Sequence, residues 1–72
     1  MARRSLYYFD RWEDYDAAGT HICQKLPGEY NNGVYFEASG GDTFKAEIYD
    51  NCSNPTLAAS IIREHGGQFY SA

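Results

Sequence analysis

The sequence predicts one α+β domain over residues 1–72: a mostly antiparallel, three- to five-stranded sheet with one α-helix of the C-terminal half packed on one face. Two observations predict this class. Residues 34–49 alternate apolar and polar side chains around a glycine-rich turn, which is typical of a β-hairpin. Residues 54–67 combine a helix cap, an apolar stripe at helical spacing and a glycine stop. A chain of 72 residues suits a single domain with a modest core.

The register of the 34–49 hairpin follows from the positions of its apolar residues. Residues that pair across antiparallel strands share a face of the sheet, so apolar positions must oppose apolar positions. A two-residue turn at Gly40 and Gly41 fails, because it sets Phe44 opposite Glu37. A three-residue loop over residues 40–42 succeeds, with a glycine taking the positive φ that it needs. This register pairs Val34 with Ile48, Phe36 with Ala46 and Ala38 with Phe44 inward, and Tyr35 with Glu47 and Glu37 with Lys45 outward.

The chain before the hairpin begins with a short strand. Residues 5–9 (SLYYF) are aromatic enough to form it, although both of its faces are apolar. Residues 10–18 form either a short helix, capped by Asp10 and ended by Gly19, or an acidic loop. The acidic residues lie where the helix dipole favours them.

Residues 20–26 (THICQKL) predict a second strand, with Ile22 and Leu26 facing inward. Residues 28–33 (GEYNNG) then supply the turn chemistry for a reversal into the hairpin. The segment before the hairpin therefore adds two strands to the predicted sheet.

The clearest helix covers residues 55–65. Asn54 suits the cap position and Pro55 the first helical position, and two glycines follow the last helical residue. Residues 68–71 predict a returning edge strand with one buried aromatic residue, Phe69 or Tyr70. The apolar stripe that packs this helix on the sheet consists of Leu57, Ala58, Ile61 and Ile62.

A formal charge of −4 indicates an acidic protein. We expect Arg3 and Arg4 in a flexible N-terminus, which leaves four basic against ten acidic groups from residue 5 onward. Such a body repels nucleic-acid phosphate and attracts basic grooves of other proteins. The sequence therefore predicts a basic protein surface as partner and no direct nucleic-acid binding, with the chain a monomer or a homodimer.

The apolar run at residues 6–9 is too short for a signal-peptide core or a membrane span. We therefore expect a cytoplasmic protein without membrane contact, located in the host cell if a phage encodes it. In such a reducing compartment Cys23 and Cys52 are expected to be free thiols.

The residues His21, Cys23, Cys52 and His65 match the ligand types of a zinc site but not its spacing. Structural zinc sites use close pairs such as C-x₂₋₄-C and H-x₃₋₅-H. On one strand face, His21 and Cys23 would lie about 6.8 Å apart, too far for a base to hydrogen-bond a nucleophile. We therefore predict no metal, no cofactor and no catalytic residue. A small thiol- or metal-dependent enzyme built on these four residues ranks third among the functions.

Acidic and aromatic side chains alternate in two stretches of the chain. Taken singly, carboxylates keep a small protein soluble, and Trp12 would close the core. The combination favours binding, since tyrosine and tryptophan supply large contact areas at interfaces. Carboxylates two apart on a strand also lie about 6.8 Å from each other, similar to phosphates along a nucleic-acid strand. The predicted partner-binding residues are Asp10, Trp12, Glu13, Asp14, Tyr15 and Asp16 in the first stretch, and Tyr35, Glu37, Glu47 and Tyr49 in the second.

In its length, its acidic body and its patches at residues 12–16 and 35–49, the chain resembles the anti-CRISPR proteins, small inhibitors carried by phages and mobile elements. The resemblance is one of type and not of motif. It implies a non-catalytic inhibitor that covers the basic DNA- or guide-binding surface of a CRISPR effector, in part as a DNA mimic. At a charge of −4, shape recognition by tyrosines matters as much as electrostatics. The alternative is an antitoxin or accessory subunit that binds a basic protein.

Overall fold

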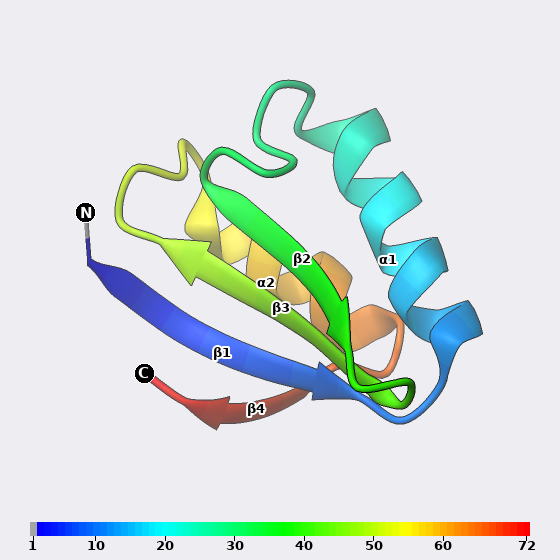
Figure 1. Ribbon diagram of the computed structural model, residues 1–72. Helices are drawn as coiled ribbons and strands as arrows, with labels where there is room; N and C mark the ends of the chain where they lie inside the picture. The colour runs from blue at the N-terminus through cyan, green and yellow to red at the C-terminus, as the bar shows by residue number, and fades with distance from the viewer. Residues whose placement is uncertain (1) are drawn as a thin grey trace.

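The computed structural model describes residues 2–72 and shows a four-stranded antiparallel sheet with two helices on one face (Figure 1). The elements follow in the order β1 (Arg3–Phe9), α1 (Trp12–Lys25), β2 (Val34–Ser39), β3 (Thr43–Tyr49), α2 (Pro55–Glu64) and β4 (Gln68–Ser71). The strands are ordered β2-β3-β1-β4 in space, so β2 and β4 form the edges. The predicted α+β class is confirmed. No helix among these residues is both long and apolar enough to cross a membrane.

The hairpin of β2 and β3 has the predicted register. The strands end in the pair Ser39 and Thr43, which leaves residues 40–42 as the loop. Gly40 and Gly41 both take positive φ, 67° and 83°, a conformation that residues with a Cβ rarely adopt. The confirmed pairs are Val34 with Ile48, Tyr35 with Glu47, Phe36 with Ala46, Glu37 with Lys45 and Ala38 with Phe44.

The first strand begins earlier than predicted, at Arg3, and the expectation of a flexible N-terminus for Arg3 and Arg4 is wrong. The backbone of Ala2 is fixed to Asp50, because each residue's amide N–H donates a hydrogen bond to the other, at 3.0 Å to the carboxylate and 2.9 Å to the carbonyl. Arg3 pairs with Tyr49 across the sheet. Both arginines therefore belong to the folded body, whose charge is less negative than predicted.

The strand predicted over residues 20–26 is also wrong, since residues 20–25 continue α1 and Leu26 is its C-cap. Ile22 and Leu26 are four residues apart, a spacing that fits one face of a helix as well as one face of a strand. Together with Ala18 they form the buried stripe that α1 turns to the sheet.

Both predicted ends of the helix over residues 10–18 are wrong, although the helix itself, rather than the acidic loop, is present. Arg11 and not Asp10 holds the cap position, and no side chain caps the helix there. Gly19 does not end the helix but lies inside it. A Cβ on Gly19 would approach Cε2 of Tyr30 to 3.2 Å, so the glycine lets the Tyr30 ring lie close to α1.

The C-terminal helix α2 confirms the prediction to within one residue. Asn54 caps it, because its side-chain oxygen accepts a hydrogen bond from the Leu57 amide at 3.1 Å. At the other end, the amides of Gly66 and Gly67 donate to the carbonyls of Arg63 and Ile62, which is the Schellman arrangement. Gly66 has the positive φ, 92°, that this motif requires.

The last strand, β4, is the predicted edge strand and pairs with β1. The prediction that Phe69 or Tyr70 is buried is wrong: their side chains are 58% and 69% exposed. Four residues on an edge leave these rings without an element to cover them.

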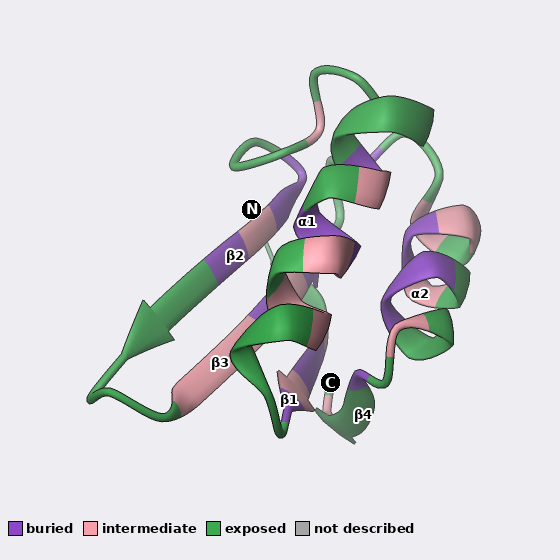
Figure 2. Ribbon diagram, turned by 90° about the vertical axis from the view of Figure 1, so that its right-hand side faces the viewer, coloured by how far each residue is buried: buried purple, intermediate pink, exposed green. Residues whose placement is uncertain are grey.

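The core lies between the inner face of the sheet and the two helices (Figure 2). Its largest fully buried side chains are Ile22 of α1, Val34 of β2, Ile48 of β3 and Ile62 of α2. The opposite face of the sheet carries no helix (Figure 1).

Candidate protein-binding surfaces

The first predicted stretch, residues 10–16, forms the turn into α1 and the beginning of this helix, and we call it the acidic end. Trp12 is the first residue of α1 and is 52% exposed. Its ring lies 5.4 Å from that of Tyr15 and 6.2 Å from that of Phe44 on β3, between centroids. Trp12 therefore does not close the core. Tyr15 does, because it packs against both Phe36 and Phe44.

The acidic end carries four carboxylates and one guanidinium. Arg11 lies 3.5 Å from Glu13, in an ion pair whose side chains are 66% and 70% exposed. Within residues 2–72, no ion pair involves Asp10, Asp14 or Asp16. The positive end of the α1 dipole stabilises carboxylates in the first turn without a cation. The negative charge of this end therefore remains available to a partner.

A cavity of about 220 Å³ runs along α1 beside the acidic end. Tyr30 forms one wall and is held there by stacking on Phe36, with ring centroids 5.3 Å apart. Burial raises the pKa of Tyr15 above its ordinary value, and the charges of Tyr30, Glu37 and Asp16 raise it further, so the hydroxyl stays neutral. The lining residues are Trp12, Tyr15, Asp16, Gly19, Thr20, Cys23 and Tyr30.

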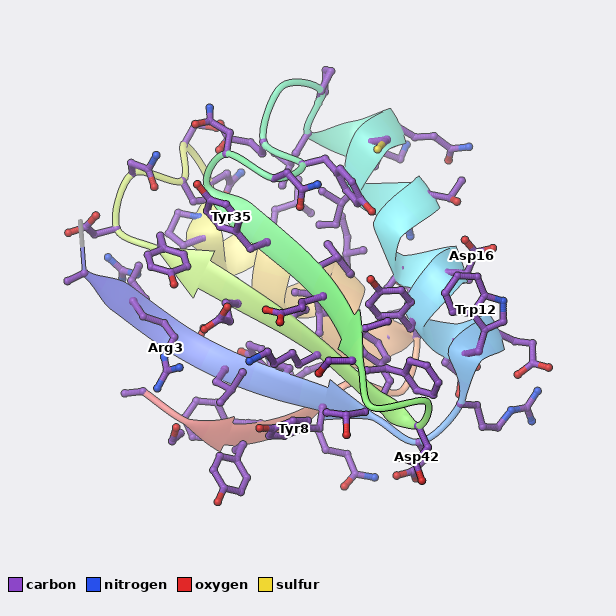
Figure 3. All side chains as sticks on the ribbon, viewed as in Figure 1. Arg3, Tyr8, Trp12, Asp16, Tyr35 and Asp42 are labelled. Carbon is purple, nitrogen blue, oxygen red and sulfur yellow. The ribbon has the colours of Figure 1, made fainter. Side chains whose placement is uncertain are left out.

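The second predicted stretch lies on the uncovered face of the sheet, which we call the open sheet face (Figure 3). Tyrosines stand in two edge-to-face pairs there. Tyr35 and Tyr49 have ring centroids 5.1 Å apart, and Tyr8 and Tyr70 lie 5.2 Å apart. Edge-to-face pairs of this kind stabilise by about 0.5–1.5 kcal/mol beyond their buried area. These tyrosines therefore partly support one another.

Between the tyrosine pairs, the open sheet face holds two ion pairs. Arg3 Nη1 lies 3.1 Å from Glu47 Oε2, and Lys45 Nζ lies 3.7 Å from Glu37 Oε1. Both carboxylates predicted to attract a partner here already have a cation of the chain itself beside them. The open sheet face is therefore tyrosine-rich but electrically balanced, whereas the acidic end is not.

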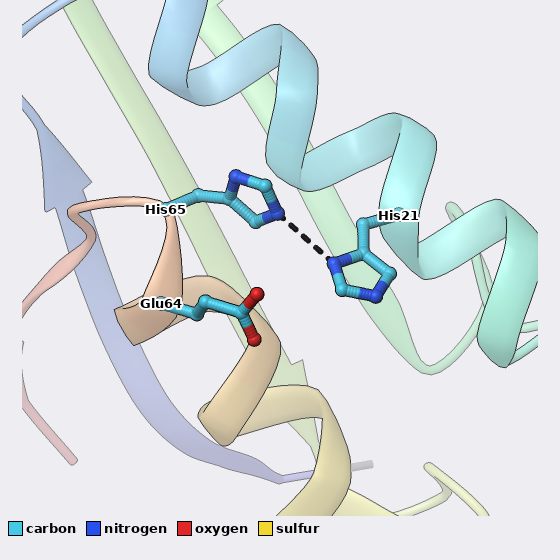
Figure 4. A group of neighbouring side chains, drawn as sticks. All are labelled: His21, Glu64 and His65. Carbon is cyan, nitrogen blue, oxygen red and sulfur yellow. Dashed lines mark hydrogen bonds between the residues drawn. The ribbon is translucent and has the colours of Figure 1, made fainter.

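The four residues considered for zinc separate into two pairs of different behaviour. Cys23 is exposed and Cys52 is buried, and both are free thiols, as predicted. Burial raises the pKa of the Cys52 thiol, which keeps it protonated and a poor nucleophile. His21 and His65, by contrast, meet: Nδ1 of His21 lies 2.9 Å from Nε2 of His65 (Figure 4).

The structure thus divides the predicted binding residues between two surfaces. Six lie at the acidic end, and Tyr35, Glu37, Glu47 and Tyr49 lie on the open sheet face (Figure 3). Sequence reasoning missed Tyr8 and Tyr30, since both faces of the first predicted strand are apolar and its alternation gave Tyr8 no defined face. Comparisons with protein-family models, curated proteins and solved structures found no match to this chain.

Proposed function

We propose that this protein is a non-catalytic, protein-binding inhibitor whose acidic end docks on a basic nucleic-acid-binding surface and blocks it. One observation carries the proposal. Three carboxylates, on Asp10, Asp14 and Asp16, are without an ion-pair partner among residues 2–72, and the same short segment carries a half-exposed tryptophan, Trp12. Aromatic anchors are enriched among the residues that dominate binding energy, and complementary charge accelerates encounter.

The resemblance to anti-CRISPR proteins indicates which kind of protein would carry the basic surface that the acidic end binds. The proposed partner is the DNA- or guide-binding groove of a CRISPR effector in the cytoplasm of the host cell. A groove that holds nucleic acid is lined by cations that neutralise phosphates, and the carboxylates of the acidic end would take the place of those phosphates. The aromatic wall beside them, with Trp12 and Tyr30, would add shape recognition.

Binding in this proposal requires no reaction. The buried thiol of Cys52 is protonated and supports a structural rather than a nucleophilic role. The open sheet face would contribute as a secondary contact surface through Tyr35 and Tyr49. Its carboxylates contribute less charge, since Arg3 and Lys45 already offset them.

A competition assay with purified CRISPR effectors tests the proposal. Each effector, loaded with its guide, binds a fluorescent target duplex in the presence of increasing amounts of this protein, and anisotropy reports the bound DNA. We expect one effector type to lose DNA at stoichiometric protein. The double variant Asp10→Asn with Asp16→Asn should then require about tenfold more protein, because it removes two charges that no ion pair within residues 2–72 offsets.

The matched control neutralises two carboxylates on the other surface, Glu37→Gln with Glu47→Gln. We expect this variant to inhibit within about twofold of the unchanged protein at equal salt concentration. If the two double variants weaken inhibition equally, the acidic end is not the docking surface. If no effector loses DNA, whether this protein is added before or after the guide, the anti-CRISPR proposal is wrong, and binding to another basic protein, as in an antitoxin, takes its place.

A further inference from the structure

His21, Glu64 and His65 come together on the side of α1 that faces the end of α2 (Figure 4). His21 lies in the C-terminal half of α1, Glu64 is the last residue of α2, and His65 is its C-cap. The Schellman turn at Gly66 and Gly67 fixes the backbone of His65. Two elements far apart in the sequence thus place three potential metal ligands at one point.

The separations of the donor atoms suit one small cation. One donor atom from each of the three residues lies within 4.8 Å of the other two, and the two ring nitrogens are 2.9 Å apart. Zinc binds imidazole nitrogen at roughly 2.0–2.1 Å, so tetrahedral geometry sets two nitrogens about 3.3 Å apart. A small movement of the half-buried rings, which increases the distance between the two nitrogens by about 0.4 Å, reaches that spacing. Glu64 is exposed, so its side chain is free to turn toward the cation.

We propose that His21, Glu64 and His65 form a binding site for one divalent transition-metal ion, with Zn²⁺ as the best match. Imidazole favours Zn²⁺, Ni²⁺ and Cu²⁺, whereas Mg²⁺ and Ca²⁺ require mostly oxygen ligands. Three protein ligands leave the fourth tetrahedral position to water. The ion would tie α1 to the end of α2. The site is separate from the docking proposal, since none of its ligands belongs to the acidic end or the open sheet face.

A hydrogen bond between the two histidines is the competing explanation of their contact. One neutral ring would donate its N–H to the unprotonated nitrogen of the other, which accounts for 2.9 Å between nitrogens without any metal. In that case Glu64 has no role. The carboxylate therefore distinguishes the two explanations, because a metal site uses it and a simple hydrogen bond does not.

Titration of the whole, metal-free protein with ZnCl₂ tests the site by calorimetry and by NMR of the histidine rings. The chain has only two histidines, so the imidazole spectrum reports on this site alone. We expect one ion per chain, simultaneous shifts of both rings, and no response to MgCl₂. At a hundredfold excess of zinc over its dissociation constant, the melting temperature should rise by about 10 °C or more.

Variants assign the ligands. Losing a histidine ligand should cost at least the roughly hundredfold in affinity that the loss of an outer-shell partner can cost, so His21→Gln and His65→Gln should each weaken zinc binding by about that much. Glu64→Gln should weaken it less, by about tenfold, because the amide keeps a neutral oxygen at the place of the carboxylate that can still reach the ion. Two matched controls should bind zinc like the unchanged protein: Cys23→Ser, which removes an exposed thiol, and Glu37→Gln, which removes an exposed carboxylate elsewhere.

The proposal is overturned if millimolar ZnCl₂ shifts neither imidazole ring, if Glu64→Gln binds zinc as well as the unchanged protein, or if Cys23→Ser abolishes binding. Circular dichroism checks the fold of every variant. Should a histidine variant not fold, the ring spectrum of the unchanged protein still decides the matter, because it requires no substitution.

Discussion

The acidic end and the open sheet face have similar residue types but different electrostatics, since the first is negative and the second is balanced. Each combines aromatic rings with carboxylates. On the open sheet face, Glu37 and Glu47 have Lys45 and Arg3 within ion-pair distance. At the acidic end, a single arginine stands among four carboxylates. Residue composition alone therefore does not determine the net charge that a surface presents to a partner. The fold determines it, because it places cations beside some carboxylates and not beside others.

The difference arises from the secondary structure that carries each group. In a sheet, side chains directly opposite on neighbouring strands lie about 4.5–5.5 Å apart, so a cation on the next strand reaches a carboxylate. At a helix start, carboxylates are stabilised by the helix dipole, by about 0.3–1 kcal/mol each, and need no cation. Glu13 and Asp14 lie in the first turn of α1. Because Glu13 also has Arg11 beside it, the dipole accounts for the available charge of Asp14, whereas Asp10 and Asp16 lie outside the first turn.

The largest predicted effect concerns the aromatic anchor of the acidic end. Trp12→Ala should weaken binding to the inhibited effector about thirtyfold, or about 2 kcal/mol, because the half-exposed ring would become buried in the interface. Tyr70→Ala is the matched control, since it removes an exposed ring from the open sheet face, and we expect less than about twofold from it. Surface plasmon resonance on the effector measures both. Equal losses would mean that one interface spans both surfaces.

A smaller effect is expected for stability, from double-mutant cycles on one ion pair of each surface. The Arg3–Glu47 pair, with side chains 35% and 13% exposed, should show a coupling free energy of about 0.5–1 kcal/mol in urea unfolding. The Arg11–Glu13 pair is far more exposed, at 66% and 70%, and should couple by less than about 0.5 kcal/mol. A stronger coupling for Arg11–Glu13 would contradict the claim that the acidic end is poorly neutralised.

Local patterns were sufficient for the parts of the fold that depend on neighbours in sequence. The hairpin register followed from the requirement that apolar residues oppose apolar residues across the two strands. The helix α2 followed from Asn54, Pro55 and the two glycines after it. The prediction of a strand over residues 20–26 was wrong for a physical reason, because a spacing of four between apolar residues is compatible with both helix and strand. Burial against the sheet, which is a tertiary effect, decides between them.

The candidate sites show the same limit more sharply. Glu37 and Lys45 were predicted as a pair because one hairpin joins them. Arg3 and Glu47, and likewise His21 and His65, are each 44 residues apart, and only the assembled fold brings them together. A zinc site of His21, Cys23, Cys52 and His65 was rejected from spacing alone, and the C-x₂₋₄-C and H-x₃₋₅-H spacings used for this describe ligands close in sequence, not residues brought together by two packed helices.

The smallest predicted effect is a pH dependence that involves both surfaces through Tyr15. Its pKa lies above the ordinary 10.0, first because of burial and then because of Tyr30, Glu37 and Asp16. Below pH 10 the phenol is neutral in the folded and unfolded states, so its contribution to stability is fully present. As pH rises further, the unfolded chain loses this proton first and the free energy of unfolding falls, by at most about 1.4 kcal/mol per pH unit.

Tyr15→Phe removes this term, so its free energy of unfolding should fall less steeply than that of the unchanged protein above pH 10. The pKa of Cys52 is also raised, so from about pH 9 upward its thiol loses its proton first in the unfolded chain. This lowers the free energy of unfolding equally in both proteins. The difference between the two proteins, measured by urea unfolding at pH 8 and pH 10.5, therefore isolates Tyr15. Identical slopes would show that Tyr15 ionises as readily in the folded protein as in the unfolded chain. That result would remove the electrostatic link between Asp16 at the acidic end and Glu37 on the open sheet face.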